Sequence, residues 1–506
     1  MSQINSRLIV VSNRLPVAIY QDGNDWKVKS SPGGLVTALA PTMRKAHGVW
    51  IGWPGCSPDA PADELLTKEV GYDYDLRAVM LTREEIARYY SGFANRSLWP
   101  LFHDLLGQFS FNTENWLAYI DVNRRFAEVV ARQLENDPDQ DSVVWVHDYQ
   151  LMLVGKFLRE MGIKVPVYFF LHIPFPSPDL FRRMPVNREL LRALLEYDHV
   201  GLQTAPDRRN FVQCVKWLSP QSRRESFRRR SYIRHEGRRI AVGYYPISID
   251  FREFNDFAGD PKVAEASWYL HENVGNRTLM LGLDRLDYTK GIPERFLAFE
   301  RALERHEELI GKISLIQIVV PSRLNVSEYQ QLKDDLDFMA GRINSRFSRH
   351  GWTPIHYEFR ELDRVQLAAH YRACEIALVT PLRDGMNLVS KEYCASQIEY
   401  KGVLILSEFA GAARQLHKGA IVVNPYDIDA TADAIYEAYI MPSEERARRM
   451  QLLRDEVRKA DVKRWVKWFL SGEAPRREST EREEDGVEEE EKEKEKETVV
   501  SESEST

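Results

Sequence analysis

Short apolar runs of strand length alternate with helical patterns along most of the chain, and this alternation restricts the folds open to it. The run RLIVVSN, residues 7–13, is apolar until it ends in polar residues, as in a strand buried on both faces of a parallel sheet. Further runs of this kind are expected at 143–147, 165–172 and 199–203. Strands that alternate with helices predict a parallel, doubly wound sheet.

The same pattern begins again in the second half of the chain. The join is expected near YPISID, residues 245–250, where Pro246 and a short polar stretch separate the two series. Ligands of doubly wound sheets bind beyond the carboxyl ends of the strands, so two facing sheets would hold an active site in the cleft between them. The predicted strands of the second series are 278–283, 313–320, 355–359, 376–380, 403–406 and 421–424.

Composition is typical of a globular protein of two or three domains, since the chain has 506 residues and 43% of them are hydrophobic. No apolar run approaches the roughly 20 residues that span a bilayer, and the N-terminus lacks the zones of a signal peptide. We therefore expect a cytoplasmic protein without membrane contact. Its four cysteines have no metal-ligand spacing, which predicts reduced thiols and no zinc site.

The net charge of −7 comes from the end of the chain, where residues 473–504 hold fifteen acidic and six basic side chains. The remainder is close to neutral, which gives no indication of nucleic-acid binding. The acidic stretch contains too little apolar surface to repay ordering, so residues 471–506 are predicted to be a disordered tail. Residues 208–239 are rich in arginine; a solvated loop or hairpin is favoured there over a docking site for an acidic partner.

The stretch 376–397, IALVTPLRDGMNLVSKEYCASQ, predicts a strand, a tight loop and a helix that Asn387 caps. Such a loop aims unpaired N–H groups and the positive end of a helix dipole at a ligand above the strand, which favours an anion. Gly385 would let the backbone approach that ligand, and Glu392 could accept hydrogen bonds from a diol such as a ribose. The alternative is an ordinary strand-to-helix turn with solvated charges.

A second phosphate signal is GLDRLDYTKG, residues 282–291, which follows the first strand of the second series. Arg285 and Lys290 lie five positions apart beyond that strand, where a guanidinium and an ammonium could both meet a diphosphate. The alternative is a pair of surface cations. Gly33 and Gly34 precede a predicted amphipathic helix at 35–45, which is another helix start suited to phosphate.

Nine ordered motifs between residues 7 and 469 together resemble the trehalose-6-phosphate synthases, which are retaining GT-B glycosyltransferases of family 20. The motifs are RLIVVSNRLP from Arg7, GGL from Gly33, GWPG from Gly52, YYSGFANRSLWPLFH from Tyr89, WVHDYQLML from Trp145, FFLHIPFPSPDLF from Phe169, RLDYTKGIPER from Arg285, TPLRDGMNLVSKEY from Thr380 and LSEFAGAA from Leu406.

The resemblance implies transfer of glucose from a nucleotide sugar, usually UDP-glucose, to C1 of glucose 6-phosphate. For the donor, it implies that Arg285 and Lys290 hold the diphosphate and that Gly34 closes a loop over it. Glu392 would hold the ribose, and His172 would contact the donor sugar near the reacting centre. The donor sugar hydroxyls would be held by Asp384 and, through the backbone, by Gly385, Met386, Asn387, Leu388 and Val389.

For the acceptor, Arg14 and Arg323 match the phosphate-binding arginines of the family. The motifs also match aromatic sugar contacts, at Trp53, Tyr90 and Trp99, and a hydroxyl-binding carboxylate, at Asp148. Arginines suit a phosphate dianion, and aromatic faces with one carboxylate suit a sugar ring. Taken alone, each of these residues could be structural. The catalytic set implied is Asp148, His172, Arg285, Lys290, Asp384 and Glu392.

Retention in this family is explained by front-face attack, in which the leaving phosphate oxygen takes the acceptor's proton. No enzymatic base is then required, and no cofactor beyond the co-substrate UDP-glucose. Catalysis would consist of positioning the sugars and stabilising charge on departing UDP. The chain has no DxD loop suited to a bridging cation, so no metal site is expected.

Two departures from the family pattern lie beside acceptor residues: Gln150 stands where HDYH is common, and Leu324-Asn325 stands where many members have Gly-Asp. Acceptor identity is therefore less constrained than donor chemistry. A glucosyltransferase to glycerol 3-phosphate and a non-catalytic regulator that binds sugar phosphates are the alternatives. The donor base, the oligomeric state, and the roles of the arginine-rich segment and the tail are left open.

The expected organisation has two Rossmann-like domains that face each other in a GT-B fold. Residues 1–248 would bind the acceptor and residues 249–443 the nucleotide sugar, while a helical segment at 444–470 would pack across the domains. No phosphatase module follows, so a separate phosphatase is expected to act on the product.

Overall fold

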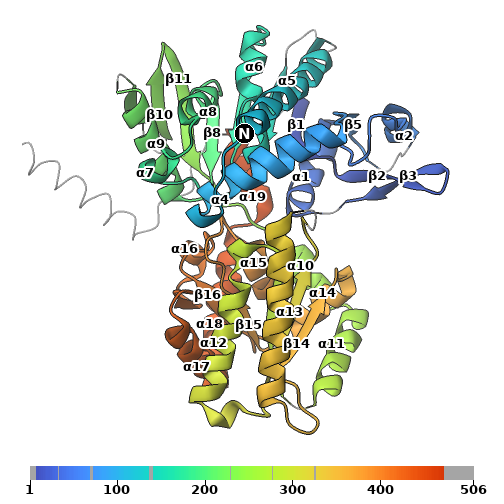
Figure 1. The fold of residues 1–506 in the computed structure, drawn as a ribbon, viewed down its shortest axis with the longest axis vertical. Helices are drawn as coiled ribbons and strands as arrows, with labels where there is room; N and C mark the ends of the chain where they lie inside the picture. The colour runs from blue at the N-terminus through green and yellow to red at the C-terminus, as the bar shows by residue number, and fades with distance from the viewer. Residues whose placement is uncertain are drawn as a thin grey trace, which may run out of the picture.

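The computed structural model describes residues 7–31, 33–68, 72–135, 141–220, 222–227, 230–275, 277–323 and 326–471. Two sheets stand one above the other, each covered by helices, and the two halves meet at a narrower waist (Figure 1). The predicted acidic tail beyond residue 471 and the departure at Leu324-Asn325 lie outside the described residues.

The first sheet has nine strands in the order β5-β4-β1-β6-β7-β8-β11-β10-β9. Its strands are parallel from β5 to β11, whereas β10 and β9 add an antiparallel hairpin at one edge. In chain order the strands are β1 (Arg7–Arg14), β4 (Val49–Trp53), β5 (Asp75–Ala78), β6 (Ser142–His147), β7 (Val167–Phe170), β8 (His199–Leu202), β9 (Arg223–Phe227), β10 (Arg230–His235) and β11 (Arg238–Tyr244).

The second sheet has six strands, all parallel, in the order β14-β13-β12-β15-β16-β17. This confirms the prediction of two doubly wound parallel sheets. A separate hairpin pairs β2 (Val17–Asp22) with β3 (Asp25–Ser30). The strands of the second sheet are β12 (Thr278–Arg285), β13 (Ile313–Val320), β14 (Ile355–Phe359), β15 (Ile376–Val379), β16 (Val403–Ser407) and β17 (Ile421–Val423).

The helices of the first half cover its sheet; residues Ile86–Leu98 form a π-helix, η1, and the short η2 and η3 are 3-10 helices. The others are α1 (Gly34–Lys45), α2 (Ala62–Lys68), α3 (Arg83–Glu85), α4 (Trp99–Phe102), η2 (Leu106–Gln108), α5 (Thr113–Glu135), η3 (Tyr149–Leu151), α6 (Val154–Glu160), α7 (Pro178–Phe181), α8 (Asn187–Leu194) and α9 (Ala205–Leu218).

The helices of the second half begin directly after the join, with α10 capped by Asp250. They are α10 (Phe251–Ala258), α11 (Pro261–Val274), η4 (Tyr288–Lys290), α12 (Ile292–Arg305), η5 (Glu307–Leu309), α13 (Ser327–Phe347), α14 (Arg364–Ala373), α15 (Leu388–Ser396), α16 (Ala413–Leu416), α17 (Ile428–Ile440), α18 (Ser443–Lys459) and α19 (Val462–Ser471). None of the helices described here is long and apolar enough to cross a membrane.

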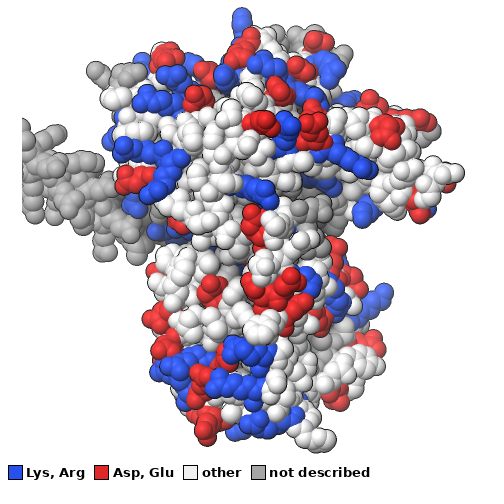
Figure 2. All heavy atoms as spheres, in the orientation of Figure 1, with Lys and Arg blue, Asp and Glu red and all other residues white. Residues whose placement is uncertain are grey.

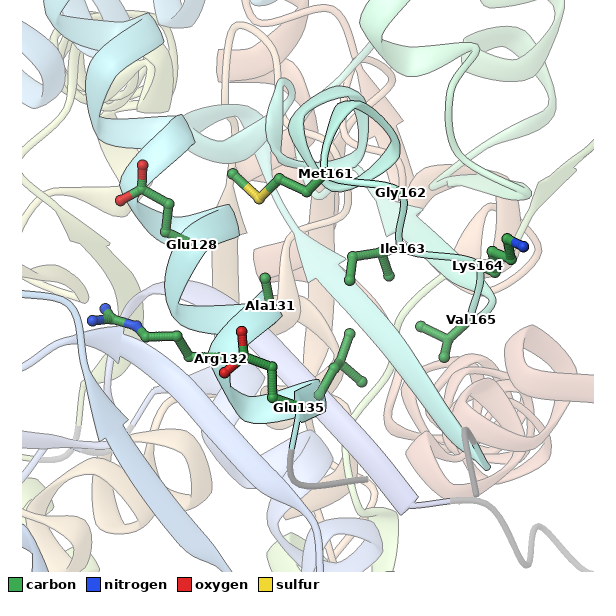
Figure 3. Close-up of a pocket in the computed structure, with 10 residues that line it drawn as sticks. Glu128, Ala131, Arg132, Glu135, Met161, Gly162, Ile163, Lys164 and Val165 are labelled. Atoms are coloured by element: carbon green, nitrogen blue, oxygen red, sulfur yellow. The ribbon is translucent and has the colours of Figure 1, made fainter. Parts of the chain in front are cut away.

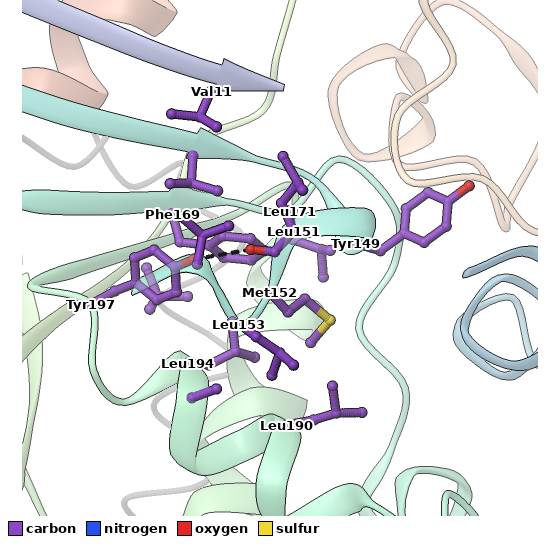
Figure 4. Packing of buried hydrophobic residues seen from close by; sticks show 14 of the residues in the cluster. Val11, Tyr149, Leu151, Met152, Leu153, Phe169, Leu171, Leu190, Leu194 and Tyr197 are labelled. Atoms are coloured by element: carbon purple, nitrogen blue, oxygen red, sulfur yellow. Dashed lines mark hydrogen bonds between the residues drawn. The ribbon is translucent and has the colours of Figure 1, made fainter. Parts of the chain in front are cut away.

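The sheet of the first half packs a buried cluster on each face, and the cluster that α8 covers is one of the two. Strand residues such as Val11 and Phe169 belong to the same buried cluster as Leu190 and Leu194 of α8 (Figure 4). The Tyr197 hydroxyl in this cluster donates to the Leu151 carbonyl at 3.1 Å, so its polar atom is satisfied within the apolar layer.

The four cysteines are free and buried, which confirms the prediction of reduced thiols.

The last two helices tie the halves together. In α18, Arg454 donates to the Ala395 carbonyl at the end of α15, at 2.6 Å. The chain then turns back, and α19 lies among the elements of the first half (Figure 1), where Phe469 stacks on Trp145 with ring centroids 4.5 Å apart.

Positive and negative side chains are interspersed over both halves on the face shown in Figure 2, as expected of a nearly neutral body.

Candidate active site

The two halves touch through loops that follow strand ends. A Cβ atom at Gly385 would lie 2.2 Å from the carbonyl oxygen of His172, so the loop after β15 is packed directly against the loop after β7. A Cβ at Gly34 would lie 2.8 Å from Cδ1 of Leu388, so the start of α1 faces the start of α15. The predicted phosphate-binding helix starts of the two halves therefore lie together.

The start of α15 is shaped by Asn387. This residue has φ of 78°, and its side-chain oxygen accepts a hydrogen bond from the Ser390 N–H at 3.0 Å, which confirms the predicted cap. Met386 is buried, whereas Leu388 and Val389 are half-buried, at the N-terminal end of the helix. The start of α15, where the first N–H groups have no partner within the helix, lies at the interface between the halves.

Asp384 and Lys290 form an ion pair at this helix start. The Lys290 ammonium donates to Asp384 Oδ2 at 2.5 Å, and the Asn387 amide donates to the same oxygen at 3.2 Å. Burial raises the pKa of Asp384, but the Lys290 ammonium outweighs burial and holds that pKa below its usual value. Asp384 is therefore an ionised carboxylate that orders the cation beside it.

Two further residues that were predicted to bind the donor, Arg285 and Glu392, lie at or beyond the ends of strands of the second sheet. Arg285 is the last residue of β12 and its side chain is exposed. Glu392 lies one turn into α15, where its carboxylate accepts a hydrogen bond from the Tyr371 hydroxyl at 2.7 Å. Burial raises the pKa of Glu392, so this carboxyl lies in a dry environment where a hydrogen bond to a ligand hydroxyl is strengthened.

Among the residues predicted to bind the acceptor, Arg14 ends β1 and its guanidinium stacks on the Trp53 ring, 4.4 Å from the centroid. The Trp53 indole N–H donates to the Cys56 carbonyl at 3.0 Å, which fixes the ring. A Cβ at Gly55 would lie 2.6 Å from an Arg14 nitrogen, so glycine at this position leaves room for the arginine.

Arg323 bridges the halves from the loop after β13. Its guanidinium donates to Asp287 at 3.2 Å within the second half. It also donates to the Tyr149 hydroxyl at 3.2 Å and lies over the Trp99 ring at 4.3 Å, both in the first half. Arg323 has a left-handed backbone with φ of 52°, and such strain at a non-glycine residue is typical of functional loops.

Tyr90, on η1, interacts electrostatically with arginines from both halves. Burial raises the pKa of Tyr90, but the charges of Arg323 and Arg285 outweigh burial and lower it below its usual value. Arg14 interacts electrostatically with the same phenol. One tyrosine is therefore within the fields of cations from both sheets, and the predicted donor and acceptor arginines share one region.

Asp148 and His172 lie beyond β6 and β7 and contact each other. The His172 backbone N–H donates to Asp148 Oδ1 at 3.1 Å, and Asp148 adopts φ of 75°. Burial raises the pKa of Asp148 to about 6 and lowers that of His172 to about 3. The His172 ring is therefore neutral, and its Nε2 lies 3.1 Å from Nδ1 of His147.

Three residues that the sequence did not single out complete the site. Asp287 lies within the RLDYTKG motif and could have been found from its position between Arg285 and Lys290. His147 directly precedes Asp148, but nothing in the sequence indicates its contact with His172. Tyr329, on α13, donates to Asp287 at 3.4 Å and is more than thirty positions away in the chain.

A separate hollow of about 690 Å³ lies at the end of α5 and the loop before β7 (Figure 3). Glu128, Arg132 and Lys164 line it, and none of the predicted site residues does. Within the part of the chain that the structure describes, no group of three or more histidine, cysteine or acidic side chains could hold a metal ion.

Comparison with known proteins agrees with this geometry. The chain matches the model of glycosyltransferase family 20 over residues 6–473. A trehalose-6-phosphate synthase from Mycolicibacterium gilvum (strain PYR-GCK) is 40% identical over 477 residues, which cover 92% of this chain and 93% of that protein. The UDP-forming α,α-trehalose-phosphate synthase A of Dictyostelium discoideum is 38% identical, and the match covers 92% of this chain and 62% of that protein.

Two solved structures are similar over the same extent. A UDP-forming α,α-trehalose-phosphate synthase from Burkholderia xenovorans, in complex with glucose-6-phosphate, has a TM-score of 0.83 and 35% identity, covering 92% of this chain and 99% of that chain. A structure from E. coli bound with UDP-2-fluoro glucose has a TM-score of 0.82 and 36% identity, covering 92% and 98%. These matches confirm the resemblance inferred from the nine motifs and the GT-B fold. The chain belongs to glycosyltransferase family 20.

Proposed function

We propose that this glycosyltransferase moves glucose from UDP-glucose to glucose 6-phosphate with retention, giving α,α-trehalose 6-phosphate and UDP. The observation that carries the proposal is the meeting of two cation sets at Tyr90, with Arg285 from one half and Arg14 from the other. A transferase with two phosphorylated substrates needs such a pair of anion sites. The relatives add support, since one is in complex with glucose-6-phosphate and another is bound with UDP-2-fluoro glucose.

In the donor site, Arg285 and Lys290 would neutralise the diphosphate together with the start of α15, and Gly34 would close over it. Glu392 would accept hydrogen bonds from the ribose hydroxyls. Asp384 and the backbone of residues 385–389 would hold the glucose, with His172 beside its reacting carbon. We propose UDP-glucose as the donor rather than GDP-glucose or ADP-glucose, because one relative is UDP-forming and another is bound with UDP-2-fluoro glucose.

In the acceptor site, Arg14 and Arg323 would bind the phosphate of glucose 6-phosphate as two guanidinium forks. Trp53, Tyr90 and Trp99 would contact the sugar, and Asp148 would accept a hydrogen bond from one of its hydroxyls. The left-handed backbone of Arg323 and the stacking of Arg14 on Trp53 both fix a cation before the ligand arrives.

The reaction breaks the bond between C1 of glucose and the phosphate oxygen and forms a bond from C1 to the acceptor hydroxyl oxygen on the same face. The hydroxyl proton passes to the departing phosphate oxygen, so no side chain has to act as a base. Arg285, Lys290 and the α15 helix start would stabilise the charge that develops on UDP. We propose that neither a metal ion nor another cofactor is required.

For the chain as a whole, we propose an acceptor-binding domain at 1–248, a nucleotide-sugar domain at 249–443 and a connecting helical segment at 444–470. We also propose that a separate phosphatase removes the phosphate from the product and that the enzyme acts in the cytoplasm. A homo-oligomer is compatible with the fold.

The test is a panel of purified protein with UDP-, GDP- and ADP-glucose against glucose 6-phosphate, glycerol 3-phosphate and glucose. Release of nucleoside diphosphate should be fastest with UDP-glucose and glucose 6-phosphate, and a chelator should leave the rate unchanged. Faster transfer to glycerol 3-phosphate would replace the proposed acceptor. Absence of release with every pair would contradict the proposal in favour of a sugar-phosphate-binding regulator.

A further inference from the structure

We propose that Asp287 is a positioning residue that holds the acceptor-side cation Arg323 and the donor-side cation Lys290 in one hydrogen-bonded unit. The inference deepens the proposed function, on which it rests, by assigning a residue that couples the two substrate sites. Asp287 itself would contact neither substrate.

One oxygen of the Asp287 carboxylate holds Arg323. Oδ2 accepts from the Arg323 guanidinium at 3.2 Å and from the Tyr329 hydroxyl at 3.4 Å. The side chains of Asp287 and Arg323 are 2% and 7% exposed. Removing one member of so buried a pair leaves the other charge uncompensated, so the pair is held together strongly.

The other oxygen holds the turn that carries Lys290. Oδ1 accepts from the Thr289 backbone N–H at 3.0 Å and from the Thr289 hydroxyl at 2.9 Å, which caps η4. Lys290 ends this turn and reaches Asp384 at 2.5 Å. The cap on η4 therefore sets the point from which the Lys290 ammonium approaches the α15 helix start.

Asp287 also spans the two halves. The Trp99 indole N–H, from α4, donates to Oδ1 at 3.3 Å, so the same carboxylate fixes an aromatic ring of the acceptor site. Burial raises the pKa of Asp287, but the charges of Arg323, Lys290 and Arg285 outweigh burial and hold that pKa below its usual value. The carboxylate is therefore ionised, and both of its oxygens act only as hydrogen-bond acceptors.

This arrangement matters because a phosphate dianion is recognised by a guanidinium fork only in a fixed orientation. Bound to Asp287 through one nitrogen and stacked on Trp99, Arg323 retains further N–H groups for a phosphate. Without the carboxylate, the guanidinium would have to reorder on binding, which weakens acceptor affinity.

Two substitutions separate the two roles of the carboxylate. Asp287→Asn keeps an oxygen that can cap η4 but replaces the oxygen that faces Arg323 with an N–H donor. Asp287→Ala removes both. Dissociation constants for UDP, and for glucose 6-phosphate in the presence of UDP, are measured by calorimetry on the full chain.

For Asp287→Asn we expect the dissociation constant of glucose 6-phosphate to rise at least about tenfold, while that of UDP changes less than about threefold. For Asp287→Ala we expect both constants to rise. Tyr329→Phe removes the neutral hydroxyl that donates to Asp287 Oδ2 and accepts from the Arg323 guanidinium, and leaves the charge pair in place. It should weaken glucose 6-phosphate binding by a smaller factor and leave UDP binding unchanged. This milder variant keeps the test decisive if Asp287→Asn folds poorly.

A double-mutant cycle with Arg323→Ala shows whether Asp287 acts through the arginine. In the Arg323→Ala background, Asp287→Asn should cause no further loss of glucose 6-phosphate affinity. Additive losses, or equal losses of UDP and glucose 6-phosphate affinity in Asp287→Asn, would overturn the positioning role. A wild-type protein that binds UDP but not glucose 6-phosphate would instead overturn the proposed acceptor, and with it this inference.

Asp363→Asn is the matched control, because Asp363 caps α14 by accepting from the Gln366 N–H at 2.8 Å and is exposed. This substitution makes the same chemical change at a helix cap away from the site. Both dissociation constants should stay at their wild-type values; a change as large as that of Asp287→Asn would also overturn the role.

Discussion

At the scale of single residues, the Lys290–Asp384 pair lies at the centre of the proposed donor site. Both side chains are largely buried, with 13% and 15% of their surfaces exposed. Such a pair stabilises the fold little compared with an apolar contact, whereas breaking it by removing one partner is costly. Binding of the donor diphosphate at the start of α15, as proposed, would give the pair a functional role.

We predict that Lys290→Met lowers UDP affinity at least about tenfold, because the diphosphate loses a cation and Asp384 becomes an unpaired carboxylate. The free energy of unfolding should fall by about 3 kcal/mol. Adding Asp384→Asn should recover stability but not UDP affinity. Calorimetric titration and urea unfolding measure the two effects, and unchanged UDP affinity in Lys290→Met would contradict the assignment.

Asp148 provides a prediction that depends on pH. Its pKa is raised by burial to about 6 in the folded state, against about 4 in an unfolded chain. The neutral carboxyl therefore favours folding below about pH 4, and this contribution is lost as the pH rises through about 6.

Asp148→Asn replaces the carboxylate with a neutral group of the same shape. We expect the variant to be more stable than the wild type at pH 8, with a difference that shrinks as the pH falls below about 6. Urea unfolding at pH 8 and pH 5 measures the difference. A difference that does not change with pH would show that Asp148 is not buried in its charged form.

Sequence reasoning identified the residues that motifs mark and missed the contacts that tertiary packing creates. Asn387 was predicted as a cap because local chain geometry determines it. The contact between His147 and His172 depends on how β6 and β7 lie side by side, which the order of residues alone does not reveal.

At the scale of elements, the β15–α15 loop lies against the β7 loop at Gly385. A side chain at this position would meet the His172 backbone at 2.2 Å, and backbone cannot move aside as a flexible side chain can. The two loops carry Asp384 and His172, so their separation sets the distance between the proposed donor-sugar contacts.

Gly385→Ala should therefore reduce kcat/KM by about a hundredfold, because displacement of a reacting group by about 1 Å has that effect. Gly107→Ala is the control, since a Cβ there would meet no atom within 4 Å. Steady-state kinetics on both variants measure the effect. Equal activities would mean that the loops separate without consequence for the site.

The predicted elements differ in how well the sequence specified them. β13 and β14 begin and end at the residues predicted from the sequence, 313–320 and 355–359. In the arginine-rich segment a hairpin was one of the predicted forms, and β9 does pair with β10. The sequence did not predict that this hairpin extends the first sheet, because the residues of β9 lack the alternation of apolar and polar side chains that indicates a strand. The π-helical winding of residues 86–98 has no periodic signal that sequence reasoning could have used.

At the scale of the whole molecule, α19 returns the end of the described chain to the first sheet. Phe469 is fully buried between Trp145 and His199, with ring centroids at 4.5 and 4.4 Å. The Trp465 indole N–H donates to the Tyr245 carbonyl, at the join between the halves, at 3.1 Å. The helix therefore stabilises the first half and the join together.

We predict that Phe469→Ala lowers the free energy of unfolding by about 3–5 kcal/mol, the range for loss of a buried phenylalanine. Phe338→Ala removes a side chain that is 71% exposed and should change it by less than about 0.5 kcal/mol. Denaturant unfolding of both variants provides the comparison. Equal effects would show that α19 contributes no packing to the fold.

The central claim is that two anion sites from opposite halves bring a nucleotide sugar and a phosphorylated glucose to one point of reaction. The most direct test is NMR analysis of the product formed from UDP-glucose labelled with ¹³C at C1 and unlabelled glucose 6-phosphate. The account predicts a single disaccharide phosphate in which the labelled carbon keeps the α configuration and is bonded through oxygen to C1 of the acceptor. A β-linked product, a bond to another acceptor position or release of free labelled glucose alone would contradict it.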